Sequence, residues 1–545
     1  MDLSDLRGIV KHKGTPAGPP HSSYGKVAKV GTLWALGQQS GSQMLQLGAA
    51  VVLARLLTPY DFGIGAAVGF FLRLANKLSS IGFGTALVRL KEVRPEHLSS
   101  VFVVALGMSL TMWLALTLSA PALAGLFHNE AIGPALRVAA LVYLLLPFGV
   151  GQFAEMNRQF RFKQKALVTW THSVVFVVVS IALALAGYRY WSLIWSTLLA
   201  SMASTLVKIY LGGVQPRLRF SKAAFMEVVP FGAGLQANRI LTFCAEYLDS
   251  LIVGRLLGLT ALGFYDKAFS TVDRVVDRLT AGPGVFLRIF SIIREDPERL
   301  RRAYRKSVLG GTLLGLPTFA VLIVLGPELI PFMYGDQWRF SVLPFQILCV
   351  AGLFRVSGAY ASAVTQAQGR IWLETMRLGV YLTLVVVSAW IGAAWGIAGV
   401  AVGIAIANGV MSLSMQTLVC KLTKLRWREV FGAQLPALSV ALILAATMLG
   451  AQLAYGWLAP DAPEWHRLTI KLLGAAVAGL CLFLKPPFQA VRALRDEVLI
   501  ELAPWAIRFL PAWSGVAPAE SESVEKDTTR PGAMPPVPEE HVSRT

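Results

Sequence analysis

Charged side chains are scarce in this 545-residue sequence: Asp, Glu, Lys and Arg make up 15% of it, whereas hydrophobic residues make up 55%. A typical soluble domain has about 25% charged residues. The mean hydropathy of +0.58 is also too high for a protein whose surface faces water. Because a membrane-spanning helix takes about 20 apolar residues, about fourteen spans account for nearly the whole chain. These shortages exclude a soluble multidomain protein and leave no room for a large extramembrane domain.

Short alternating segments of the kind that build membrane β-barrels are also lacking. Apolar runs instead approach or exceed the length of a spanning helix, as in Val101–Leu118, Ala166–Gly187 and Ala437–Leu449. In a membrane, a single segment satisfies all its backbone hydrogen bonds only as a helix. The sequence therefore predicts an all-α, polytopic membrane protein.

Motifs for metal binding and nucleotide hydrolysis are missing. The four cysteines, Cys244, Cys349, Cys420 and Cys481, lie far apart, with no C-x-x-C pair and no histidine at ligand spacing. No G-x-x-x-x-G-K-[ST] phosphate loop occurs, which argues against direct nucleotide-driven pumping. We expect no metal site, no catalytic residues and no cofactor, and an energy source that is either a proton or sodium gradient or consumption of the product.

The formal net charge of +19 is compatible with nucleic-acid binding until the positions of the charges are considered. Lys and Arg lie mostly between the apolar runs and gather in alternate connections, such as 158–165, 294–306 and 421–428. This distribution follows the positive-inside bias and reports contact with anionic lipid headgroups. We therefore expect a membrane partner, no nucleic acid, and cytoplasmic N- and C-termini.

Fourteen spans and seven regions follow from this pattern. The spans are 31–54, 62–88, 99–125, 132–156, 166–187, 189–212, 231–254, 262–290, 307–327, 340–365, 371–394, 398–420, 432–457 and 467–484. The regions are a basic cytoplasmic arm (1–30), an N-lobe (31–212), a cytoplasmic connector (213–230), a C-lobe (231–420), two extra spans (421–485), an amphipathic interfacial segment (486–515) and a disordered tail (516–545). The eighth span is poorly apolar, but omitting it would place both later basic connections on the outer side.

An internal repeat relates the two lobes. Val51–Leu57 matches Leu251–Leu257 at an offset of 200 residues, and Gly63 then falls on Gly263. Both copies occupy the outer end of the first helix in a set of six spans. This position predicts two pseudo-symmetric six-helix lobes related by an axis along the membrane normal, although chance or a shared way of ending a helix also explains a short match.

Several segments resemble the prokaryotic polysaccharide flippases of the Wzx type. They are Leu53–Gly63 (LARLLTPYDFG), Ile81–Val88 (IGFGTALV), Leu262–Ala268 (LGFYDKA), Met333–Trp338 (MYGDQW) and Gln366–Arg370 (QAQGR). Their order and spacing over residues 25–485 are more specific than any one of them. The resemblance implies membership of the multidrug/oligosaccharidyl-lipid/polysaccharide exporter superfamily, with a two-lobe fold and alternating access.

The resemblance also implies a substrate and a place of action. It implies translocation of undecaprenyl-diphosphate-linked oligosaccharide across the bacterial plasma (inner) membrane for surface polysaccharide assembly, with a polysaccharide polymerase or co-polymerase as a partner. A multidrug exporter of the same superfamily is the nearest alternative. A membrane glycosyltransferase or polymerase is a third alternative, but it would need acidic residues or metal ligands in larger outward loops.

Cations within predicted spans are the candidate substrate-binding residues, because a charge in hydrocarbon costs about 2.5–3.5 kcal/mol and normally faces a partner or a wet cavity. The residues expected to hold the diphosphate are Arg73, Lys77, Arg239, Arg274 and Arg278, with Arg137 and Arg355 as further candidates. Arg and Lys suit this task because they form charge-assisted hydrogen bonds with phosphate oxygens.

Acidic residues are the candidates for a gate or for ion coupling. Asp273 and Asp277 fall on Arg73 and Lys77 at the 200-residue offset, so we expect these pairs to approach when one side of the cleft closes. The alternative is that Arg274 neutralises Asp277 within one helix and that Lys77 reaches toward a lipid headgroup. Glu246 and Asp249 are candidate proton or sodium sites, with pairing to Arg239 as the alternative.

Uncharged polar residues are the candidates for lining the cavity. They are Gln39, Gln43, Gln46 and Asn76, of which the three glutamines follow helical spacing. Amides bond sugar hydroxyls, but hydrogen bonding between packed membrane helices explains the same stripe.

Overall fold

The computed structural model describes residues 24–79, 94–159, 161–212, 218–280, 283–458, 464–484 and 491. All regular secondary structure in these ranges is helical. In the first half of the chain the helices are α2 (Tyr24–Leu56), α3 (Pro59–Ser79), α5 (Pro95–Leu126), α6 (Ile132–Ala140), α7 (Val142–Leu145), α8 (Pro147–Arg158), α9 (Phe162–Leu185) and α10 (Trp191–Gly212). In the second half they are α11 (Lys222–Leu257), α12 (Leu259–Leu279), α13 (Pro283–Ile292), α14 (Pro297–Tyr334), η2 (Asp336–Ser341), α15 (Val342–Ala367), α16 (Ile371–Gly392), η3 (Ala393–Trp395), α17 (Gly396–Thr423), α18 (Trp427–Leu458) and α19 (Glu464–Leu484).

The all-helical, multi-pass character predicted from the sequence is confirmed. Seven of the described helical stretches are long and apolar enough to cross a membrane, or eight if a bent pair counts as one span. Every predicted span overlaps a described helix, but α2, α3, α11, α12 and α19 are not among these seven stretches. The count of fourteen therefore stays a prediction. The amphipathic and tail regions (486–515 and 516–545) lie outside the described residues apart from residue 491.

Two predicted spans are interrupted. The span 132–156 is divided into α6–α7 and α8, which are bent by 48° where Pro147 begins α8. Proline lacks a backbone N–H, so Pro147 cannot donate the hydrogen bond that would join the first turn of α8 to the preceding helix. The span predicted at 262–290 is likewise two helices, because α12 ends at Leu279 and Pro283 begins α13.

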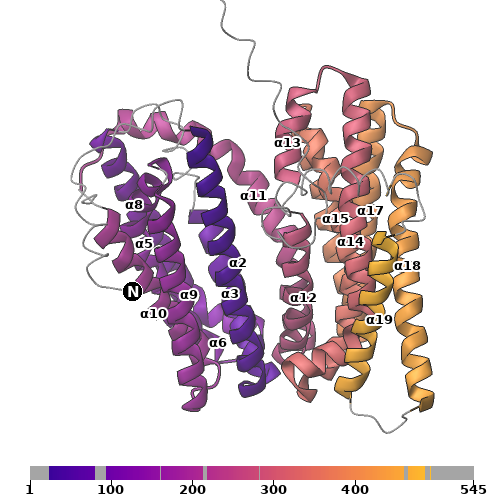
Figure 1. Ribbon diagram of the computed structural model, residues 1–545. Coiled ribbons are helices and arrows are strands. Elements are labelled where there is room, and N and C mark those ends of the chain that lie inside the picture. The colour runs from indigo at the N-terminus through magenta and orange to yellow at the C-terminus, as the bar shows by residue number, and fades with distance from the viewer. Residues whose placement is uncertain are drawn as a thin grey trace, which may run out of the picture. The chain divides into compact units, whose positions relative to one another are not determined.

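The contacts between helices divide them into two sets. In the first half α9 packs against α2 and α10, and α5 packs against α6 and α8; in the second half α14 and α15 pack against α18 and α17 (Figure 1). Helices α3 and α12 join the two sets, since they pack against each other and α11 contacts both. The helices predicted to carry the candidate cations and acids are therefore the ones that bring the two halves together.

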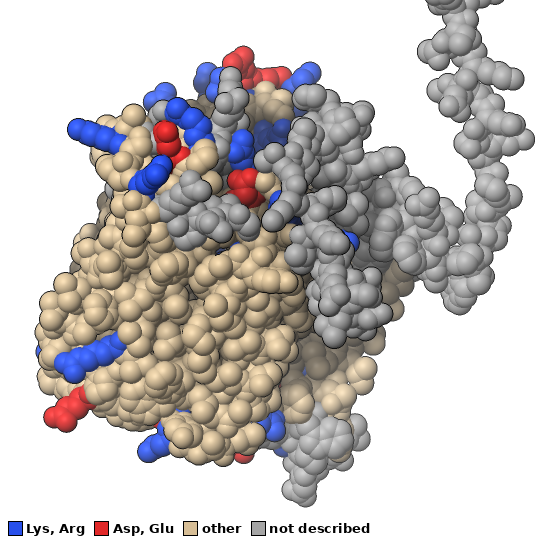
Figure 2. Space-filling model, turned by 90° about the vertical axis from the view of Figure 1, so that its left-hand side faces the viewer, with Lys and Arg blue, Asp and Glu red and all other residues tan. Residues whose placement is uncertain are grey.

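Figure 2 shows one face of the molecule, where a broad band without charged side chains separates charged groups at the two ends. Such a band is what a hydrocarbon layer about 30 Å thick requires of the surface that it touches. In the sequence the apolar runs and the basic connections alternate. In the fold, on the face seen here, the uncharged band lies between charged ends.

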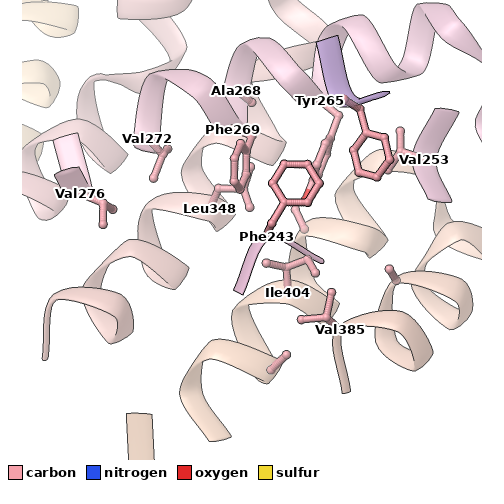
Figure 3. Packing of buried hydrophobic residues seen from close by; sticks show 14 of the residues in the cluster. Phe243, Val253, Tyr265, Ala268, Phe269, Val272, Val276, Leu348, Val385 and Ile404 are labelled. Carbon is pink, nitrogen blue, oxygen red and sulfur yellow. The ribbon is translucent and has the colours of Figure 1, made fainter. Parts of the chain in front are cut away.

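An apolar core fixes the orientation of α11 and α12. Phe243 of α11, Phe269 of α12, Leu348 of α15 and Ile404 of α17 lie against one another in this core (Figure 3). The rings of Phe243 and Tyr247 are 5.0 Å apart. Phe243 and Tyr247 lie one turn apart on α11, and Glu246 between them is within Coulombic range of charged groups on α3, α12 and α15.

The last predicted span is attached to the second half by a buried ion pair. Lys471 of α19 bonds both carboxylate oxygens of Glu328 on α14 at 2.7 and 2.8 Å, and also donates to the Val324 carbonyl. Lys471 is 2% exposed, so its charge has these partners in place of water. A fully bonded pair of this kind fixes the register between α19 and α14.

Candidate functional site: a charged cluster on helices α3, α11, α12 and α15

Two cations of α3 face the second half of the chain. Arg73 and Lys77 are both exposed on the last two turns of the helix, one turn apart. The guanidinium carbon of Arg73 lies 5.0 Å from the ring centroid of Tyr247 on α11. This cation–π contact holds one face of the guanidinium, and Arg73 remains exposed.

Four further charged groups surround Glu246 of α11. The residues within Coulombic range of its carboxylate are Lys77 of α3, Asp273 and Asp277 of α12, and Arg355 of α15. Their sequence positions span almost 280 residues. We call these five residues together with Arg73 the charged cluster; it is the place where the structure brings the candidate cations and acids together.

An ion pair within this cluster joins α15 to α12. Arg355 donates from Nη1 to Oδ1 of Asp273 at 2.8 Å, and both side chains are about three-quarters buried. From the sequence we expected Arg355 to be a further candidate for contacting the diphosphate and Asp273 to meet Arg73. In this conformation Asp273 is instead held by Arg355, and whether Arg73 approaches it in another conformation stays a prediction.

Asp249 is buried beside the charged cluster. It is 2% exposed and accepts hydrogen bonds from the Tyr265 hydroxyl at 2.6 Å and the Ser250 N–H at 2.7 Å. A cavity of about 30 Å³ adjoins it, lined by Glu246, Asp249, Arg355, Tyr381 and Asn408 among others. This volume holds a water molecule or a small cation. Within the described residues no cluster of three His, Cys, Asp or Glu side chains has metal-binding geometry.

The remaining cations of α11 and α12 are more open. Arg274 and Arg278 are exposed, and Arg274 lies within Coulombic range of Asp266 on the same helix. No ion pair joins Arg274 to Asp277, although the structure describes both side chains. Arg239 is half-buried two turns before Glu246. Asn76 of α3 is exposed beside Lys77.

Two glutamines of α2, Gln38 and Gln46, face α9. Gln46 donates to the Ser173 hydroxyl at 3.2 Å, and Gln38 donates to the Thr169 hydroxyl at 2.8 Å. These contacts are hydrogen bonds between packed helices. Gln39 is exposed and Gln43 is half-buried, so the cavity-lining prediction stays open for them.

Three residues of the site have no signature in the sequence. Tyr247 stands between Glu246 and Asp249, Tyr381 lies in an apolar run, and Asn408 lies among small residues of α17. Tyr381 shares a hydrogen bond with Asn408. Their roles as a stacking partner and as cavity lining depend on packing between helices, which no spacing along one helix reveals.

Comparisons with known proteins identify the family of the chain. The family described as polysaccharide biosynthesis protein matches residues 52–343, which is more than half of the chain. The chain is 24% identical over 384 residues to the lipopolysaccharide biosynthesis protein WzxC of Escherichia coli (strain K12), covering 68% of this chain and 76% of the relative. It is 26% identical over 310 residues to the succinoglycan biosynthesis transport protein ExoT of Rhizobium meliloti (strain 1021), covering 56% and 63%.

Two solved structures share the fold. The lipid II flippase MurJ, in an inward closed conformation, gives a TM-score of 0.64 at 13% identity and covers 83% of this chain and 99% of its own. An inward-facing multidrug resistance transporter of the MATE family gives 0.59 at 16% identity, with 70% and 96% covered. The family expected from the order of the sequence motifs is thereby confirmed, and the chain belongs to the polysaccharide biosynthesis protein family of Wzx-type membrane proteins.

Proposed function

We propose that the chain is a flippase that moves an oligosaccharide linked to a polyprenyl diphosphate across the bacterial inner membrane, by alternating access between its two halves. The observation that carries this proposal is the charged cluster, to which α3 of the first half and α11, α12 and α15 of the second half contribute. Charged groups in spanning helices need a shared wet cavity or partners. The names of WzxC and ExoT, which refer to lipopolysaccharide biosynthesis and to succinoglycan biosynthesis transport, support the same class of cargo.

The cations of the site suit the diphosphate. Arg73 and Lys77 on α3 and Arg274 and Arg278 on α12 are exposed, and Arg73 is already oriented by the Tyr247 ring. A phosphate oxygen bound by arginine forms charge-assisted hydrogen bonds that are roughly twice as strong as neutral ones. In this proposal these cations, with Arg239, hold the diphosphate while the glycan occupies the space between the halves.

The acids of the site suit coupling to a cation. Glu246 and Asp249 both line the small cavity beside Arg355. Entry of a proton or sodium ion would change the local charge that Arg355 and Asp273 experience, because all of these groups lie within one cavity or in contact with it. We propose that this step biases the equilibrium between the two directions of access. A gradient-dependent assay with Glu246→Gln and Asp249→Asn tests it.

Alternate basic connections set the proposed orientation. The segments 158–165, 294–306 and 421–428 face the cytoplasm, and both termini lie on the same side. The ends of α2 and α11, at Arg55 and Arg255, then face outward. As a transporter, the protein binds and releases its cargo without making or breaking covalent bonds.

Transport by proteoliposomes that contain an undecaprenyl-diphosphate-linked glycan tests the function. Arg73→Gln is expected to lower the initial rate about tenfold or more, because each charge-assisted hydrogen bond is worth about 1.5–3 kcal/mol. The matched control is Arg299→Gln, since Arg299 bonds Asp296 at the start of α14, outside the cluster. Equal rates for Arg73→Gln and Arg299→Gln would contradict the proposed diphosphate site. Export of cationic drugs without movement of the glycan would favour the multidrug alternative.

A further inference from the structure

The two copies of the internal repeat touch each other through reciprocal glycine contacts. A Cβ atom at Gly63 of α3 would lie 1.8 Å from the carbonyl oxygen of Leu259 on α12. A Cβ at Gly263 of α12 would lie 1.8 Å from the carbonyl oxygen of Pro59 on α3. Only glycine allows the backbones of α3 and α12 to approach this closely. The repeated glycines therefore set the distance between the halves at this end.

Two arginines that are also 200 residues apart each donate a hydrogen bond to a helix of the opposite half. Arg55 lies in the last turn of α2 and donates from Nη2 to the Phe332 carbonyl of α14 at 2.6 Å. Arg255 lies in the last turn of α11 and donates from Nη1 to the Leu126 carbonyl of α5 at 2.7 Å. The last carbonyls of a helix lack partners within the helix. Each arginine thus completes the end of a helix that belongs to the other half.

A buried lysine completes this junction. Lys267 of α12 is 5% exposed, and its Nζ lies 3.8, 4.7 and 5.0 Å from the ring centroids of Phe62, Tyr334 and Trp338. Phe62 belongs to α3, whereas the other two rings belong to the second half. The indole N–H of Trp338 also crosses between the halves, donating to the Ala54 carbonyl at 2.8 Å. Cation–π contacts are stronger when they are desolvated, as they are here, than at exposed sites.

We infer that Arg55, Gly63, Arg255, Gly263 and Lys267 form a latch that closes one end of the path between the halves and opens once in each transport cycle. This inference rests on the proposed function. Apart from the glycine contacts, the two arginines and the indole N–H of Trp338 bond backbone carbonyls, and Lys267 contacts aromatic rings. Water can solvate all of these groups when the halves part, so opening leaves no buried carboxylate without a partner. The repeated segment therefore supplies a junction that is tight when closed and inexpensive to open.

Distance measurements between spin labels test the latch without any substrate. Labels at Leu185→Cys and Phe340→Cys, in a chain whose native cysteines are replaced by serine, lie on opposite halves at exposed positions, 68% and 74%. Gly63→Val is expected to shift the distance distribution to longer values by several ångströms, because its side chain cannot share space with the Leu259 carbonyl. The matched control is Gly65→Val. A Cβ at Gly65 meets only a movable methyl of Leu193 in its own half, at 2.9 Å.

A second variant keeps the test valid if Gly63→Val does not fold. Arg55→Gln combined with Arg255→Gln removes both reciprocal bonds without adding volume, and should increase the long-distance fraction. An unchanged distribution for Gly63→Val, or for the double variant where Gly63→Val does not fold, overturns the latch. A shifted distribution together with no glycan transport by the unsubstituted protein would instead support the latch and overturn the proposed function.

Discussion

The two copies of the repeat share the junction between the halves but differ in the charges that they place beyond it. Gly63 and Gly263 play the same part, as do Arg55 and Arg255. Farther along the helices the same offset sets Arg73 and Lys77 of α3 against Asp273 and Asp277 of α12. The helix ends of the two copies therefore pack in the same way, whereas positions farther along α3 and α12 carry opposite charges.

The first helices of the two copies show the same asymmetry. Gln39 and Gln46 of α2 correspond to Arg239 and Glu246 of α11. Gln46 bonds a hydroxyl of the neighbouring helix α9, whereas Glu246 lies among charges from three other helices. An amide can be satisfied by one packed neighbour, but a carboxylate in a spanning helix needs cations or water. The second copy therefore carries charged residues of the cluster at positions where the first copy carries amides.

The largest expected effect comes from breaking the ion pair of the second copy. Arg355→Met leaves Asp273 without its cation, and removal of one partner of a buried pair costs about 3–5 kcal/mol. We expect a corresponding loss of thermal stability in detergent and at least a hundredfold fall in the transport rate. Adding Asp273→Asn should restore most of the stability but not the transport. A double variant with wild-type transport would show that the pair is only structural.

A charge reversal between the copies is expected to have an intermediate effect. Lys77→Glu adds a negative charge near Glu246, Asp273 and Asp277, and should lower transport about tenfold, equivalent to about 1.4 kcal/mol. Lys77→Glu combined with Glu246→Lys restores the charge balance across α3 and α11. Recovery of transport in the double reversal, measured in proteoliposomes, would locate the interaction between these two residues.

No recovery in the double reversal would mean that Lys77 and Glu246 act separately. The pair Lys77 and Glu246 is a sharper choice than Arg73 and Asp273. Asp273 already bonds Arg355, so reversing Asp273 would also set two cations against each other. The matched control is Arg299→Glu, which reverses a charge outside the cluster.

Much of the fold follows from the sequence, because apolar runs and basic connections report spans directly. The helix α12 is the instructive case: its hydropathy is low, and a helix lies where charge parity predicted the eighth span, while its crossing of the membrane stays a prediction. The break at Pro147 was not predicted because it lies within an apolar stretch, and the end of α12 at Leu279 was not predicted because charge parity does not report where a helix ends. Bends depend on a single residue within an otherwise apolar stretch.

The candidate site was predictable in its residue types but not in its pairing. Spacing along α3 and α12 placed the cations on one helix and the acids on the other. That Arg355, 82 residues after Asp273, would be the partner of that acid depends on how α15 packs against α12. Likewise, Tyr247 is an ordinary aromatic residue in sequence, and only packing places its ring under Arg73.

The smallest expected effect concerns the first copy, where Gln46 bonds Ser173. Hydrogen bonds between membrane helices average about 0.6 kcal/mol, so Gln46→Ala should slightly lower the unfolding temperature and keep transport within about twofold. Ser173→Ala should have the same effect, and the double variant should add little, because both remove one bond. Additive losses of stability, or a tenfold fall in transport for Gln46→Ala alone, would place Gln46 in the cavity and make the two copies more alike than their contacts indicate.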